Sequence, residues 1–91
     1  MKHVFAKPFE FEGKEYKDVT LDLESLTGHD ISAVKREWTA SGNFSAMPVT
    51  DSDFCAAVAA RASKLPIDFF YALPAKEYAK LTQAVSNFLL A

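Results

Sequence analysis

The chain has few of the residues that build covalently linked, metal-bound or membrane-embedded proteins. One of its 91 residues is cysteine, so no disulfide can form within it, and two histidines with one cysteine are too few and too scattered for a recognisable metal site. No apolar run is long enough to cross a bilayer, and the N-terminus lacks the apolar core of a signal peptide. We therefore expect a cytoplasmic protein with no metal site and no membrane partner.

Glycine is also scarce, and acidic residues outnumber basic ones. Three glycines spread over the chain exclude a glycine-rich phosphate-binding loop. A net charge of -2 and an isoelectric point near 5.6 argue against a polyanion as the main partner, because nucleic-acid affinity depends on neutralising phosphates. The hydrophobic content of 49% is that of a globular protein, and the length predicts a single domain over residues 1–91.

The N-terminal segment has the alternating pattern of a β-hairpin, which we place at residues 1–24. Phenylalanines lie on one side of the first strand and glutamates on the other: Phe5, Phe9 and Phe11 against Glu10 and Glu12. Gly13-Lys14 is a plausible two-residue turn. Apolar residues then alternate with polar ones at Val19, Leu21 and Leu23. Pro8 suits an edge strand, and the apolar face of the hairpin needs a cover.

Residues 27–91 carry the start signals of several helices. Capping-box patterns occur at Thr27 to Asp30 and at Thr50 to Asp53. Pro66 and Pro74, each preceded by leucine, mark two further starts, since proline is tolerated in the first turn and disruptive later. The sequence therefore predicts an α+β fold, with the hairpin packed on a small bundle of three to four helices.

Each predicted helix has one apolar face. The first carries Ile31, Val34 and Trp38 and ends at Gly42, after which residues 41–48 form a loop. The second helix carries the stripe Phe54, Cys55, Val58, Ala62 and Leu65. The last helix aligns Tyr78, Leu81, Val85 and Phe88, with Ala75 and Leu89 beside them.

The sequence offers no convincing catalytic or cofactor-binding group. Cys55 lies on an apolar stripe and is expected to be a buried structural thiol. His29, within a capping box, is expected to be exposed. Ser52 between two aspartates faintly resembles the modified serine of acyl carrier proteins, but helix capping explains the pattern better. Lys35 and Arg36 lie close to Trp38 and could contact nucleic acid, but Glu37 interrupts the basic run. A solvated helix face is the simpler interpretation.

The most informative surface candidates are aromatic and apolar residues in the C-terminal half. Three consecutive aromatic residues at 69–71 cannot share one helix face, because neighbours are about 100° apart, so at least one must point away from the core. Bulky apolar residues also lie at the chain end, where a helix would normally fray. The predicted partner-binding residues are Phe69, Phe70, Tyr71, Phe88 and Leu89.

The order of these segments resembles a known family. A hairpin ending in residues 21–30 (LDLESLTGHD) precedes a helix, a variable loop and an alanine-rich helix. Leu65-Pro66 through Leu73-Pro74 then leads into a terminal helix closing with Asn87-Phe88-Leu89. This arrangement is similar to the tail assembly chaperones of tailed bacteriophages and prophages, particularly the small Mu/P2-like group.

The resemblance implies a non-enzymatic protein of virion morphogenesis that is absent from the mature virion. It implies two partners, the tape measure protein, which is kept soluble, and the tail tube protein, which assembles around it, together with homo-oligomerisation. A longer form made by ribosomal frameshifting is common in that family. Two alternatives stay open: a small phage or plasmid-encoded nucleic-acid-binding regulator using residues 31–40, and an enzyme or carrier modified at Ser52.

Overall fold

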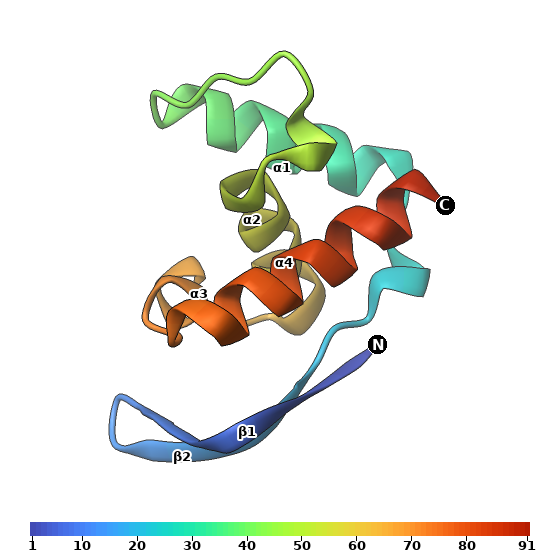
Figure 1. The fold of residues 1–91 in the computed structure, drawn as a ribbon. Helices are drawn as coiled ribbons and strands as arrows, with labels where there is room; N and C mark the ends of the chain where they lie inside the picture. Colours follow the sequence, from blue (N-terminus) through green and yellow to red (C-terminus); the bar gives the residue numbers. More distant parts are fainter.

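The hairpin lies along one end of the molecule, and the helices are stacked beyond it (Figure 1). The computed structural model describes residues 1–91. The loop after the first helix lies at the opposite end, and α4 crosses the middle. The observed architecture is α+β, a two-stranded hairpin followed by four α-helices, as the sequence predicts.

The two strands are antiparallel, β1 (Lys2–Phe11) and β2 (Lys14–Thr20). The turn is Glu12-Gly13, so the predicted Gly13-Lys14 turn was displaced by one residue. Glu12 and Gly13 have φ of 50° and 78°, the paired positive values that a tight hairpin turn requires. β2 also ends earlier than predicted, because Leu23 already begins the 3-10 turn η1 (Leu23–Ser25), although its side chain is buried.

Pairing between the strands is interrupted in the middle of β1. Val4 pairs with Asp18 and Phe9 with Tyr16, so β1 uses more residues than β2 over this stretch and forms a bulge. Pro8, which has no N–H to give to a ladder, lies in this irregular stretch. The Ala6 N–H donates instead to the Glu77 carboxylate, at 2.7 Å. A side chain of the last helix thus replaces a strand partner.

The four helices are α1 (Gly28–Ala40), α2 (Ser52–Ser63), α3 (Ile67–Tyr71) and α4 (Ala75–Leu90). A second 3-10 turn, η2 (Pro48–Thr50), precedes α2. Pro66 and Pro74 are the N-cap residues of α3 and α4, one position before the first helical residue, so both prolines open helices as predicted. None of the helices has the length and hydrophobicity that crossing a membrane requires.

The two predicted capping boxes have different outcomes. At the start of α1 the box is present: the Asp30 N–H donates to Thr27 Oγ1 at 3.4 Å, and the Thr27 N–H donates to Asp30 Oδ2 at 2.8 Å. At α2 the prediction was wrong, since Asp51 is the N-cap and accepts from the Asp53 N–H. Thr50 instead closes η2, where its hydroxyl donates to the Met47 carbonyl.

α2 is the central helix and packs against α1, α3, α4 and η2. Its alanine-rich sequence lets its neighbours approach closely, and Phe54, Cys55, Ala56, Val58 and Ala59 are almost completely buried. The hairpin contributes Phe5 and Val19 to the same core, and its end is tied to α2 by the Asp22 N–H, which donates to the Ala62 carbonyl. The predicted apolar face of the hairpin is therefore covered by helices.

Candidate functional site

The aromatic cluster predicted to contact a partner divides between core and surface. Phe69 and Phe70 are 0% exposed, whereas Tyr71 is 49% exposed. The sequence argument that one ring must face away is fulfilled by Tyr71. Phe69 and Phe70 cannot touch a partner in this conformation, because the phenylalanines of the hairpin and the helices enclose them. That part of the predicted surface is therefore corrected, and Tyr71 stays a prediction.

The apolar residues at the end of α4 lie apart from Tyr71. Phe88 is 37% exposed, whereas Leu89 is partly buried and packs against the core. The Tyr71 ring lies 6.1 Å from that of Tyr78, near the start of α4. Phe88 lies ten positions after Tyr78 on α4, a distance of about 15 Å at 1.5 Å per residue. The predicted contact residues thus do not form one continuous cluster.

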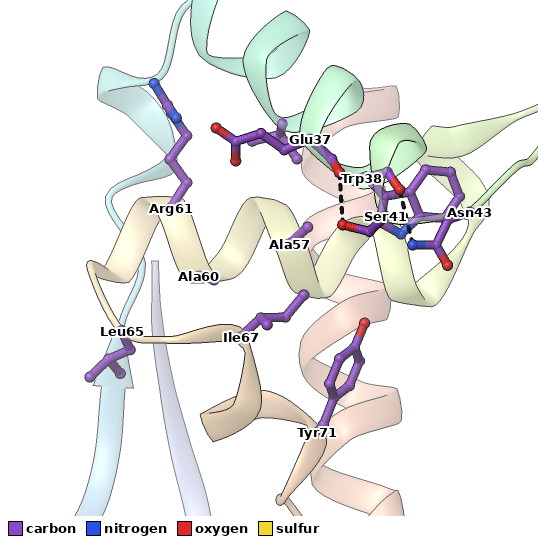
Figure 2. A pocket seen from close by; sticks show the side chains of 11 residues that line it. Glu37, Trp38, Ser41, Asn43, Ala57, Ala60, Arg61, Leu65, Ile67 and Tyr71 are labelled. Atoms are coloured by element: carbon purple, nitrogen blue, oxygen red, sulfur yellow. Dashed lines mark hydrogen bonds between the residues drawn. The ribbon is translucent and has the colours of Figure 1, made fainter.

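The structure contains a groove that the sequence did not predict. It has a volume of about 530 Å³ and lies between α1, α2 and the segment from Leu65 to Tyr71 (Figure 2). Its lining is mostly apolar. The residues that line it are Val34, Glu37, Trp38, Ser41, Asn43, Ala57, Ala60, Arg61, Leu65, Ile67 and Tyr71.

The groove exists because small and large side chains face each other across it. Ala57 and Ala60 form its α2 wall, and Figure 2 shows Ile67 and Tyr71 reaching from α3 toward α1. Trp38 forms part of the α1 wall and packs edge-on against Phe54, with ring centroids 5.5 Å apart. The alanines were visible in the sequence, but a hollow beside them depends on how the helices cross, which no local pattern encodes.

Most polar side chains of the groove are already engaged within the chain. Ser41 Oγ donates to the Glu37 carbonyl at 3.0 Å, and Asn43 Nδ2 donates to the Trp38 carbonyl at 3.0 Å. Arg61 forms an ion pair with Asp30, with 2.9 Å between Nη2 and Oδ1. The hydrogen bond from the Thr27 N–H, and then the one from Arg61, hold the pKa of Asp30 below its usual value. Few polar groups are therefore free to fix a small polar ligand.

Carboxylates surround the Tyr71 end of the groove. Tyr78 Oη donates to Asp53 Oδ1 at 2.8 Å, and Asp68 precedes Tyr71 by three residues on α3. Burial and then the charges of Asp53, Asp51 and Asp68 raise the pKa of Tyr71 above its usual value. The carboxylates of Asp51, Asp53 and Asp68 therefore act together on the Tyr71 end of the groove.

The loop between α1 and η2 presents two exposed apolar residues that are not among the predicted contact residues. Phe44 is 87% exposed and Met47 is 60% exposed. Phe44 directly follows Asn43, which lines the groove. The sequence contains a signal for the exposure of these two residues, because large apolar residues amid Ser, Gly, Asn and Pro have no helix or strand to bury them.

Cys55 is expected to react slowly with alkylating agents while the protein is folded. Its side chain is 0% exposed, as predicted, and Sγ lies 3.5 Å from the Val49 carbonyl. Burial, with a smaller effect from Asp51, raises the pKa of the thiol to about 11. Mass spectrometry after iodoacetamide treatment at pH 8 should show modification at least about 100-fold slower than in urea, because the thiolate is the reactive form. Equal rates in the two conditions would contradict the buried position.

The residues that could take part in metal binding, covalent modification or nucleic-acid binding lie apart from one another. His3 contacts Glu77, with 2.9 Å between Nε2 and Oε1, His29 is exposed on α1, and Ser52 is the first residue of α2. No group of three His, Cys, Asp or Glu side chains comes together in metal-binding geometry. Lys35 and Arg36 are exposed on the outer side of α1.

Comparison with known protein families gives a match that covers nearly the whole chain. Residues 2–90 match the family described as phage tail assembly chaperone proteins, E, or 41 or 14. No curated protein and no solved structure matches the chain. The match takes in the hairpin and all four helices, and therefore the groove as well as the surface residues predicted from the sequence. The chain belongs to the phage tail assembly chaperone family.

Proposed function

We propose that this protein binds the tape measure protein and keeps it soluble while tail tube subunits assemble around it. The observation that carries the proposal is the family match over residues 2–90. The proposed role is binding and not catalysis, and the protein acts in the host cytoplasm without entering the mature virion. A tape measure protein is long and aggregation-prone, so its chaperone must offer apolar surface that the unassembled client can cover.

The distribution of exposed apolar residues supports this role. Val4, Phe44, Tyr71, Phe88 and Leu90 are each more than a third exposed, on four different parts of the fold. Several separate apolar contacts suit a long client or a self-associating chaperone better than one small ligand. We therefore include homo-oligomerisation in the proposal, with Phe88 and Leu90 at the end of α4 as the residues to test.

Co-expression with the tape measure protein encoded by the same phage genome tests the proposal. We expect the soluble fraction of the tape measure protein to rise several-fold over expression alone. An unrelated acidic protein of similar size is the control for non-specific effects of co-expression. If the soluble fraction does not rise and the two proteins do not co-purify, the proposed function is wrong.

A further inference from the structure

We infer that the groove between α1, α2 and α3 binds an amphipathic helix that has an apolar face and basic side chains at its Tyr71 end. This inference rests on the proposed function and adds where the client docks and what its chemistry is. Trp38 of α1, Ala57 and Ala60 of α2 and Ile67 of α3 give the groove apolar walls, and the groove is open to solvent. Helix-in-groove binding uses such a surface, with anchors spaced by about one turn.

The polar groups of the groove favour an apolar occupant over a small polar one. The side chains of Ser41 and Asn43 donate to backbone carbonyls of α1, and Arg61 donates to Asp30. Trp38 Nε1 has no acceptor, but it is buried, so a ligand in the groove cannot reach its N–H. The groove offers mainly hydrocarbon and aromatic surface, which a leucine-rich helix face covers.

The charges around the groove favour a partner with positively charged side chains. The Tyr78 hydroxyl donates to Asp53, and the Tyr78 ring lies 6.1 Å from that of Tyr71. The Asp51 side chain accepts from the Asp53 N–H, and Asp68 lies one turn before Tyr71 on α3. Glu37 lines the groove and takes part in no ion pair. The one cation in the lining, Arg61, is already neutralised by Asp30. Lysine or arginine side chains of a partner are therefore attracted to the exposed Tyr71 ring and to the nearby carboxylates of Asp53 and Asp68.

Two synthetic 18-residue helices with the same leucine face test the inference, one with lysines and one with glutamates on the polar face. Trp38 is the only tryptophan, so a change in its emission reports occupancy of the groove. Anisotropy of the labelled peptides gives their affinities. We expect the lysine peptide to bind about tenfold more tightly than the glutamate peptide, and to weaken with salt. Equal binding of the two peptides, or binding without a change in Trp38 emission, would overturn the inference.

Two variants place the peptide and separate shape from charge. Ala60→Leu fills the groove from a partly buried position and should weaken lysine-peptide binding at least about tenfold, since the leucine face of the peptide can no longer pack there. Asp68→Lys should weaken the lysine peptide and strengthen the glutamate peptide, whereas Glu24→Lys, on the exposed 3-10 turn η1, should change neither. Circular dichroism checks the fold of each variant, and Tyr71→Ala, at an exposed position, replaces Ala60→Leu if that variant is unfolded. Unchanged affinity in the folded variant contradicts docking in the groove.

Co-expression distinguishes failure of this inference from failure of the proposed function. If the native protein solubilises the tape measure protein and Ala60→Leu does so equally well, the client docks elsewhere and the groove assignment is wrong. If the native protein does not solubilise the client, the proposed function is wrong, and the peptide titrations still decide whether the groove binds basic amphipathic helices.

Discussion

Replacing Phe69 by alanine is expected to destabilise the protein by about 3–5 kcal/mol, the usual cost of deleting a fully buried aromatic ring. The ring is 0% exposed and joins α3 to the hairpin. Its centroid lies 5.4 Å from that of Phe9, 5.3 Å from that of Phe11 and 4.9 Å from that of Tyr16. Small domains are stable by only about 5–15 kcal/mol, so this loss removes a large part of the total.

Urea denaturation at pH 7, followed by circular dichroism, measures the effect. Tyr71→Ala is the matched control, because Tyr71 belongs to the same short helix and is 49% exposed. Its change in the free energy of unfolding should be about 1 kcal/mol or less. If Phe69→Ala shifts the denaturation midpoint no more than Tyr71→Ala does, the ring is not the link between hairpin and helices.

The burial of Phe69 and Phe70 also changes the meaning of a charge substitution there. Aspartate at a fully buried position must ionise without water or take up a proton, and either outcome opposes folding. Phe69→Asp with Phe70→Asp is therefore expected to unfold the domain, so a loss of client binding in that variant would not locate the binding surface. Substitutions at Tyr71 and Phe88, which are exposed, can locate it.

The sequence predicted those elements whose signals are local. The α1 capping box needs only Thr27 and Asp30, and the Leu-Pro steps at Pro66 and Pro74 mark helix starts through the missing N–H of proline. The apolar face of the hairpin followed from alternation. The turn was misplaced by one residue because Glu12 adopts a positive φ, which is uncommon for a residue with a side chain.

The features that the sequence did not predict depend on contacts between distant segments. Which of Phe69, Phe70 and Tyr71 faces outward is decided by where the hairpin docks on α3, not by the helix itself. The groove beside Ala57 and Ala60 depends on the crossing of α1, α2 and α3. Three adjacent aromatics could be divided between core and surface only once these contacts were known.

Glu77 is the clearest case of a residue whose role is invisible in the sequence. In the first turn of α4 a glutamate is ordinary, because it favours the positive end of the helix dipole. In the structure it is 9% exposed and accepts from the Ala6 N–H at 2.7 Å, while His3 Nε2 lies 2.9 Å from its other oxygen. The carboxylate thus supplies the partner that β1 lacks at its bulge and fastens the hairpin to α4.

Replacing Glu77 by alanine is expected to cost about 2–3 kcal/mol at pH 7, because hydrogen bonds to a charged group are worth more than neutral ones and the Ala6 N–H loses its acceptor. Glu24→Ala, at an exposed position on η1, is the control and should stay within about 0.5 kcal/mol. Urea denaturation should be followed by Trp38 fluorescence in α1 and by hydrogen exchange of the β1 amides. An unchanged midpoint together with unchanged β1 protection would refute the role of Glu77.

Acid should abolish this contribution, and the direction follows from the pKa of Glu77. Hydrogen bonding from the Ala6 N–H and from His3 lowers the pKa of Glu77 in the folded state, and Lys80 adds a smaller effect. A carboxylate whose pKa is lowered in the folded state stabilises the fold fully when the pH is above its pKa in the unfolded state, about 4.3. This stabilisation is lost as the pH falls through the pKa of the folded state. The difference in unfolding free energy between the native protein and Glu77→Gln should therefore be largest near pH 7 and shrink as the pH is lowered below about 4. A difference that grows on acidification would show that the neutral carboxyl holds the hairpin, contrary to the geometry of two donors facing one carboxylate.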